Sequence, residues 1–129
     1  MPHILLVDDE PLIAMAFEHF LTEAGYRVTL AMNGSTALAC FEADPADIIV
    51  TDHRMPRMNG ADLLRGARVL RPGTPAIVIS GYPSELGPVD DLGDGETVIL
   101  TKPVSTRIVF KVLEGLVGDG EVRPSAMRA

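Results

Sequence analysis

The sequence predicts an α/β fold, a doubly wound three-layer (βα)5 sandwich around a five-stranded parallel sheet. Five short apolar runs alternate with segments whose apolar residues recur at helical spacing, along almost the whole 129-residue chain. The runs are continuous rather than alternating, which is typical of strands that helices cover on both faces. Such an alternation implies a parallel sheet between two layers of helices.

The five expected strands are short, mainly aliphatic runs: 4–7, 26–31, 48–50, 76–79 and 98–100. Parallel strands need crossover connections, and these are right-handed and short in almost all proteins. The flavodoxin-like strand order 2-1-3-4-5 is therefore the natural candidate, although the pattern of residues leaves the order itself open.

Residues that favour helix ends mark the expected helices. Pro11 suits the first position of a helix, and Gly25 suits the position just after its end. Asn33, Asn59 and Ser105 are plausible N-caps of three further helices. In the first helix, the apolar residues expected to share the buried face are Leu12, Ile13, Ala16, Phe17, Phe20 and Leu21.

One helical unit is irregular. Several glycines and prolines lie between residues 81 and 96, so a fourth helix would be short, broken or mobile. Residues 1–118 are expected to form one domain, and residues 119–129 to form a flexible C-terminal tail with little apolar periodicity.

Composition excludes several classes of function. The formal net charge is -7 and the basic residues are scattered, which argues against direct binding to nucleic acid or to an anionic membrane. The sequence has neither a signal peptide pattern nor an apolar stretch long enough to span a bilayer. With Cys40 as its one cysteine, the chain is expected to be soluble, reduced and cytoplasmic.

Polar residues follow the expected strands at the edge where an open α/β sheet binds its ligands. Asp8 and Asp9 follow the first strand, Asp52 the third, Ser80 the fourth and Lys102 the fifth. In the order 2-1-3-4-5 the three carboxylates would meet and repel one another unless a cation intervened. Mg²⁺ suits such oxygen ligands, and a carboxylate beside it can act as a nucleophile towards a phosphoryl group.

These residues and their neighbours resemble the receiver domain of two-component response regulators over about residues 3–117. The resemblance rests on four segments, which are Ile4–Glu10, the Asp-x-x-Met-Pro-x-Met-x-Gly pattern of 52–60, Ser80-Gly81-Tyr82 and Lys102-Pro103. The acidic pair, the motif around Asp52 and the Lys-Pro pair at these separations are a highly specific combination. Residues 1–118 would accordingly be a receiver domain.

The resemblance assigns roles at the acidic site. It makes Asp52 the phosphoacceptor and Asp9 a direct Mg²⁺ ligand, with Asp8 holding a metal-bound water. The backbone carbonyl of Arg54 would be a further metal ligand. His53 lies at a variable position of the family pattern, so a structural or solvent-facing role is expected for it.

The resemblance also concerns the response to phosphorylation. Ser80 would be the hydroxyl that moves towards the phosphoryl group and Lys102 the cation that pairs with it, followed by a cis peptide bond to Pro103. Many receivers carry an aromatic residue where this chain has Ile99, so the usual aromatic switch is in doubt. Tyr82 either substitutes for it or only covers its loop.

Receivers of this kind accept the phosphoryl group from a histidine kinase or a phosphotransfer protein. They assist their own phosphorylation and dephosphorylation, but they are signalling domains rather than enzymes. The switched surface would bind an unknown downstream protein, and a homodimer is a further option. The chain would be either a stand-alone regulator or a receiver from a hybrid histidine kinase.

Three other readings compete. A phosphatase of the haloacid-dehalogenase type needs a second carboxylate where this chain has Arg54. A flavodoxin-type carrier would have its flavin phosphate repelled by the acidic residues after the first strand. A pseudo-receiver, which binds partners without phosphorylation, stays open because of Ile99 and the irregular segment 81–96.

Overall fold

The computed structural model describes residues 2–117 and contains one five-stranded parallel sheet. The strands, in chain order, are β1 (His3–Val7), β2 (Arg27–Ala31), β3 (Ile48–Asp52), β4 (Ala76–Ser80) and β5 (Thr97–Thr101). Their order in the sheet is β2-β1-β3-β4-β5, as the sequence predicts. β1, β3 and β4 are buried along their whole length, because helices cover both faces of the sheet.

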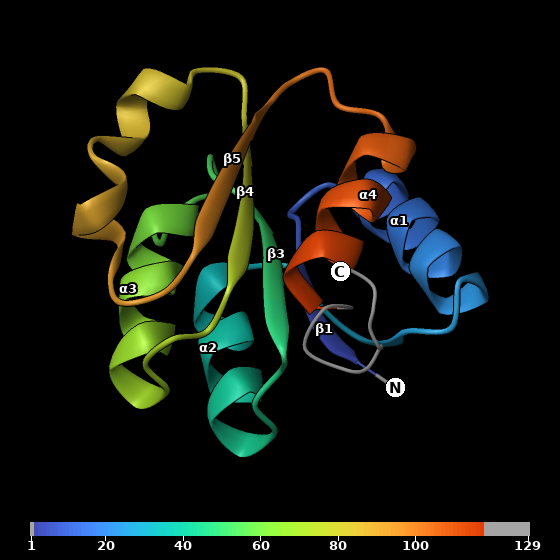
Figure 1. Cartoon of the computed structure of the whole chain (residues 1–129), viewed down its shortest axis with the longest axis horizontal. Coiled ribbons are helices and arrows are strands. Elements are labelled where there is room, and N and C mark those ends of the chain that lie inside the picture. The colour runs from blue at the N-terminus through green and yellow to red at the C-terminus, as the bar shows by residue number, and fades with distance from the viewer. Residues whose placement is uncertain (1, 118–129) are drawn as a thin grey trace.

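Helices form a layer on each side of the sheet (Figure 1). The α-helices are α1 (Pro11–Glu23), α2 (Gly34–Ala43), α3 (Gly60–Leu70) and α4 (Thr106–Val117). α1 and α4 lie on one face, and α2 and α3 lie on the other. The expected tail, residues 119–129, lies outside the described part of the chain.

The (βα)5 pattern is not complete. Between β4 and β5 the described chain forms two short 3-10 helices, η1 (Pro83–Leu86) and η2 (Val89–Leu92), and no α-helix. The helix labelled α4 follows β5. The prediction of a short, broken helix is therefore confirmed. Three glycines of this region, Gly87, Gly93 and Gly95, have positive φ, which side chains with a Cβ rarely adopt.

Predicted capping residues begin three of the helices. The side chains of Asn33 and Asn59 accept hydrogen bonds of 2.8 Å from backbone N–H groups three residues later. Ser105 Oγ accepts one of 3.2 Å from the N–H of Ile108. Each cap satisfies a backbone donor that has no partner inside the helix.

The predicted inner face of α1 was partly wrong. The buried residues are Ala14, Phe17 and Leu21, whereas Leu12 is 83% exposed and Ile13 and Phe20 are also exposed. Leu12 lies two positions before Ala14, which is roughly 200° around a helix of 3.6 residues per turn. The buried stripe is therefore narrower than the run of apolar residues suggests.

Arg68 of α3 holds the segment between β4 and β5 against the domain. Its side chain is buried and donates to the carbonyls of Thr74, Leu92 and Glu96 at 2.9 to 3.0 Å, and to Thr97 Oγ1 at 2.7 Å. Leu86 and Leu92 complete the anchoring, because both are buried in the core on the side of α2 and α3. The segment is remodelled and held in place through these contacts.

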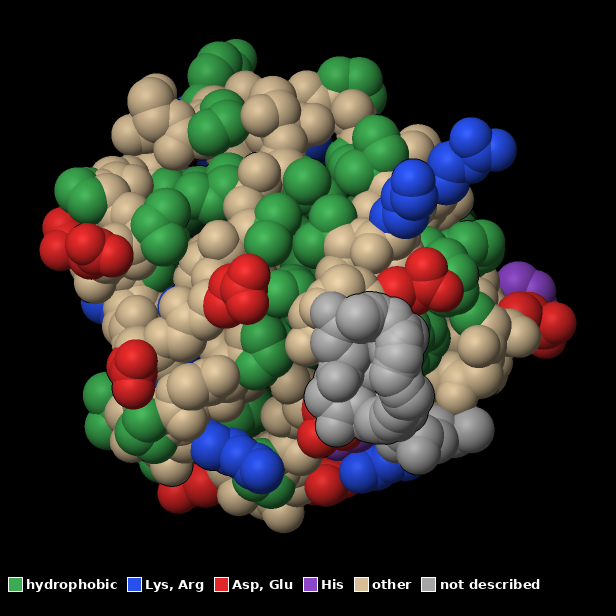
Figure 2. Space-filling model, viewed as in Figure 1, with side chains coloured by type: hydrophobic (Ala, Val, Ile, Leu, Met, Phe, Trp, Pro, Cys, Tyr) green, Lys and Arg blue, Asp and Glu red, His purple; other side chains and the backbone are tan. Residues whose placement is uncertain are grey.

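The basic residues are scattered on the face shown in Figure 2, as the sequence predicts. Lys and Arg side chains lie in separate places among acidic and apolar ones, so no broad basic patch covers this face of the described chain. Within residues 2–117, none of the helices combines the length and the apolar character that a bilayer crossing requires.

Candidate functional site

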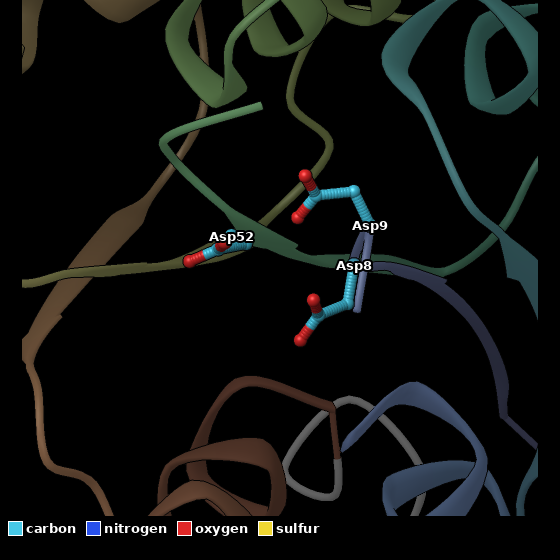
Figure 3. Close-up of side chains that lie close together, drawn as sticks. All are labelled: Asp8, Asp9 and Asp52. Atoms are coloured by element: carbon cyan, nitrogen blue, oxygen red, sulfur yellow. The ribbon is translucent and has the colours of Figure 1, made fainter. Parts of the chain in front are cut away.

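Three carboxylates gather at the carboxyl edge of the sheet (Figure 3). Asp8 and Asp9 follow β1, and Asp52 is the last residue of the neighbouring strand β3. One carboxylate oxygen of each lies within 4.8 Å of the others. The strand order and the parallel register thus bring together the acidic residues that the sequence places 43 and 44 positions apart.

Burial sets the electrostatics of this group. Asp52 is only 6% exposed, while Asp8 and Asp9 are half-buried. Burial is the main cause of a raised pKa at Asp8, and the nearby Asp52 raises it further. The hydrogen bond of 2.9 Å from the N–H of Glu10 to Asp8 Oδ1 acts in the opposite direction.

Lys102 brings a positive charge to Asp52 from the end of β5. Its Nζ lies 2.8 Å from Asp52 Oδ1, and this hydrogen bond is the main cause of a raised pKa at Lys102. The backbone N–H of Lys102 donates to the Ser80 carbonyl at 2.8 Å, which continues the β4–β5 pairing to the site. The peptide bond to Pro103 is cis, as expected.

Ser80 is buried at the end of β4, the strand next to the one that ends in Asp52. Its Oγ accepts a hydrogen bond of 3.0 Å from the backbone N–H of Tyr82. In this conformation the hydroxyl oxygen therefore holds the turn after β4. The predicted role of Ser80, movement towards a phosphoryl group, would replace this contact.

The loop after Asp52 requires a glycine at its end. The N–H of Gly60 donates to the His53 carbonyl at 2.8 Å. A Cβ on Gly60 would lie 2.8 Å from the backbone oxygen of Asp52, which is too close for any larger residue. Gly60 thus lets α3 begin against the backbone of Asp52 and His53, which gives a physical reason for the glycine that closes the motif.

Arg54 and Tyr82 form a cluster that also includes a residue the sequence reasoning missed. Arg54 pairs with Glu85 of η1 through a two-pronged contact, with Nε 3.1 Å from Glu85 Oε1. This hydrogen bonding raises the pKa of Arg54 and lowers that of Glu85. Tyr82 is 61% exposed and lies under the Arg54 guanidinium. Glu85 sits in the irregular segment, where no sequence motif marks it.

Ile99 and His53 are both shielded from solvent, Ile99 in part and His53 almost completely. Ile99 is half-buried and packs against the core on the side of α2 and α3, in register with Val78 of β4. His53 is 5% exposed, so its side chain does not face solvent. Within the described residues its Nδ1 has no hydrogen-bond partner.

The donor set fits a hard divalent cation. All three clustered side chains offer carboxylate oxygens, and the only ion pair made by any of them within the described residues is that of Asp52 with Lys102. Mg²⁺ is bound in proteins by one or two carboxylates together with waters and phosphate oxygens. The predicted contribution of the Arg54 carbonyl stays a prediction.

Comparison with known proteins points to one family. A model of the response regulator receiver domain matches residues 4–114. The sensory transduction protein RegX3 of Mycolicibacterium smegmatis is 35% identical over 120 residues, which are 93% of this chain and 52% of RegX3. The transcriptional regulatory protein GlrR of Escherichia coli is 30% identical over 87% of this chain and 25% of GlrR. The chain thus spans a quarter to about half of these relatives.

Solved structures agree. The receiver domain of the Francisella response regulator 1452 superposes with a TM-score of 0.82 at 30% identity, over 94% of this chain and 100% of that one. The receiver domain of the sensor histidine kinase PA1611 from Pseudomonas aeruginosa gives a TM-score of 0.75 at 28% identity, over 91% and 98%. From its sequence, its strand order and these matches, the chain belongs to the response regulator receiver domain family of two-component systems.

Proposed function

We propose that this domain accepts a phosphoryl group on Asp52 from a histidine kinase or a phosphotransfer protein, in a Mg²⁺-dependent reaction. The observation that carries the proposal is the pairing of the buried Asp52 carboxylate with Lys102 at 2.8 Å, within the group formed with Asp8 and Asp9. This arrangement holds a nucleophile and the charges that a transferring phosphoryl group needs in one place.

The chemical step follows from the nucleophile. A carboxylate oxygen of Asp52 attacks phosphorus as the P–N bond to the donor histidine breaks, and the electron pair of that bond leaves with the imidazole, which takes up a proton. The product is an aspartyl-phosphate. Lys102 and the Ser80 hydroxyl would then interact with the oxygens of the phosphoryl group.

Asp9, Asp52 and the Arg54 carbonyl would hold Mg²⁺, with Asp8 binding one of its waters. The bound ion would neutralise negative charge on the carboxylates and on the phosphoryl oxygens. Two related structures support this assignment. The PA1611 receiver holds a magnesium ion coordinated in its active site cleft, and the Thermotoga maritima regulator TrrA was solved in complex with Mg²⁺-BeF.

The proposed donor is supported by the relatives that contain kinases. The autoinducer 1 sensor kinase/phosphatase LuxN of Vibrio campbellii is 33% identical over 114 residues, and the hybrid histidine kinase CckA contains a similar receiver. We further propose that phosphorylation switches a protein-interaction surface around η1, β5 and α4, and that residues 1–118 form this unit with a tail at 119–129.

Incubation with Mg²⁺ and phosphoramidate, followed by intact-mass measurement, tests the proposal. We expect the wild-type chain to gain the mass of one phosphoryl group, and Asp52→Asn and Asp9→Asn to gain none or far less. Asp62→Asn is the matched control, because Asp62 is exposed on α3 and pairs with Arg65 outside the site. It should be phosphorylated like the wild type.

The alternative function is that of a pseudo-receiver, an adaptor that acts by protein binding alone. Ile99 and the irregular segment between β4 and β5 are the observations that favour it. A wild-type chain that gains no phosphoryl group and binds no Mg²⁺ in a calorimetric titration would replace the phosphoacceptor proposal with this one.

A further inference from the structure

A cavity of about 440 Å³ lies directly beneath the acidic site, on the side of the sheet that faces α1 and α4. Its walls come from β1, α1, β3, β4 and the loop after β5. The apolar side chains that line it include Leu6, Phe17, Val50, Ile79, Pro103 and Val104. This size lies within the range of small-molecule sites, which are mostly apolar with a few polar groups.

The lining of the cavity carries an excess of negative charge. Asp8, Glu10 and Asp52 line the cavity together with Lys102. Lys102, the one cation among the lining residues, is already paired with Asp52. The carboxylates of Asp8 and Glu10 have no ion-pair partner among residues 2–117.

The Asp8 side chain points to this side of the sheet. In Figure 3 its carboxylate lies towards α1 and α4, whereas the Asp9 carboxylate lies on the opposite side of β1. This agrees with the lining of the cavity, which includes Asp8 but not Asp9. Of these two neighbouring carboxylates, only that of Asp8 therefore lines the apolar cavity, together with Asp52 and Lys102 of the acidic site.

We propose that this cavity binds a small amphiphilic organic cation, with an apolar body between α1 and the sheet and a protonated amine on Asp8 and Glu10. A neutral apolar molecule would leave the two carboxylates unpaired, and an anion would be repelled by them. An amine on Asp8 would also compete with a cation bound at the acidic site. That competition rests on the proposed function, but binding to the cavity does not.

Titration of the ¹⁵N-labelled 129-residue chain with hexylamine, without Mg²⁺, tests the proposal. Hexanol and hexanoate are the matched probes, because they carry the same chain with a neutral or negative head group. We expect saturable shifts at Leu6, Phe17 and Val104, with hexylamine binding about tenfold more tightly than hexanol, or about 1.4 kcal/mol. Hexanoate binding as tightly as hexylamine, or no saturable shift at these residues, would overturn the proposal.

Two variants test the apolar wall. Val104→Phe should fill the space and weaken hexylamine binding, and Ile13→Phe should narrow the cavity from the half-exposed position on α1. Val69→Phe is the control, since Val69 is 81% exposed on α3 and distant from the cavity lining. A wild-type-like spectrum shows that a variant is folded. If Val104→Phe or Ile13→Phe is folded by this criterion and still binds hexylamine as tightly as the wild type, the proposed site is wrong.

The head group is tested separately. Asp8→Asn should weaken binding of hexylamine but not of hexanol, and Mg²⁺ should weaken hexylamine binding to the wild-type chain. If hexylamine binds Asp8→Asn as tightly as the wild type, the amine is not on Asp8 and the proposed orientation is wrong. Phosphorylation by phosphoramidate is read independently, so failure of the cavity proposal and failure of the phosphoacceptor proposal are distinguishable.

Discussion

The guanidinium carbon of Arg54 lies 4.9 Å from the centre of the Tyr82 ring. These two residues follow Asp52 and Ser80 by two positions each, so their contact joins the loop after β3 to the loop after β4. Glu85 holds the same guanidinium from η1. The cluster therefore places bulky side chains at an exposed position beside the acidic site.

We predict that this cluster prolongs the lifetime of the phosphorylated domain, because its bulk restricts water from attacking the aspartyl-phosphate. Arg54→Ala and Tyr82→Ala should each lose the phosphoryl group about three- to tenfold faster, a change of roughly 1 kcal/mol in the barrier. The loss is measured by intact mass after phosphoramidate has been removed.

Arg71→Ala is the control for this prediction, since Arg71 is exposed at the far end of α3. Its rate of phosphoryl loss should equal that of the wild type. Equal rates in Arg54→Ala, Tyr82→Ala and the wild type would reject a role of the cluster in dephosphorylation.

Lys102 should stabilise the domain through Asp52. Lys102→Met leaves a buried carboxylate without its cation, so we expect a loss of about 1 kcal/mol in the free energy of unfolding at pH 7, allowing for the half-exposed lysine side chain. In an Asp52→Asn background the same substitution should cost little. Urea unfolding of the four proteins measures this coupling as a double-mutant cycle.

The pH dependence of the Lys102 contribution has a defined sign. Because the pKa of Lys102 in the folded state is raised above 10.5, its stabilisation is fully present below pH 10.5 and is lost as the pH rises through the folded-state value. Lys102→Met should therefore differ less from the wild type in strongly alkaline solution. A difference that stays constant across this range would contradict the ion pair.

Asp8 should have the opposite effect on stability. Burial raises the pKa of Asp8 in the folded state, so ionisation of Asp8 begins to destabilise the fold above pH 3.8 and does so fully above the folded-state pKa. In metal-free buffer at pH 7, Asp8→Asn should unfold at higher urea concentration, with a gain of at most about 1 kcal/mol for a half-exposed group. The gain should fade as the pH falls through the folded-state pKa and should vanish below pH 3.8, where Asp8 is protonated in the unfolded chain as well.

The exposed Asp62→Asn variant is the comparison for Asp8→Asn. It removes an equal charge from a residue that pairs with Arg65, so it should bring no gain in stability. If Asp8→Asn is no more stable than the wild type at pH 7, burial of the Asp8 carboxylate carries no measurable cost.

Much of the fold was predictable because its signals are local. The continuous apolar runs correspond to strands that are buried on both faces, and Asn33, Asn59 and Ser105 cap helices at the predicted positions. The segment between β4 and β5 was only partly predictable. Its glycines and prolines exclude a regular helix, but the buried contacts of Arg68 join positions 24 to 29 residues apart and leave no sequence pattern.

The site was predictable for a different reason. Parallel strands end at one edge of a sheet, so residues placed directly after strands meet there once the strand order is known. Asp8, Asp9, Asp52 and Lys102 follow this rule. Glu85 and the cavity beneath the carboxylates do not, because they depend on how η1, α1 and the loop after β5 pack in three dimensions.

Arg68 should be required to hold the segment between β4 and β5 in place. Its buried guanidinium satisfies three carbonyls and one hydroxyl. Burial lowers the pKa of Arg68, and the smaller effect of the Asp94 carboxylate acts in the opposite direction. Arg68→Met keeps much of the stem but leaves these acceptors without donors, at a cost of roughly 1–3 kcal/mol for each that water does not reach. We expect a total loss of about 3 kcal/mol in the free energy of unfolding.

Hydrogen exchange measured by mass spectrometry locates that effect. In Arg68→Met, amides of residues 83–96 should exchange faster than in the wild type, and by more than those of β1 and β3, because the contacts of Arg68 hold this segment directly. Arg71→Met, at an exposed position at the end of α3, should change stability by less than about 0.5 kcal/mol. Exchange that rises equally in all strands would show that Arg68 supports the whole core and does not specifically anchor the segment.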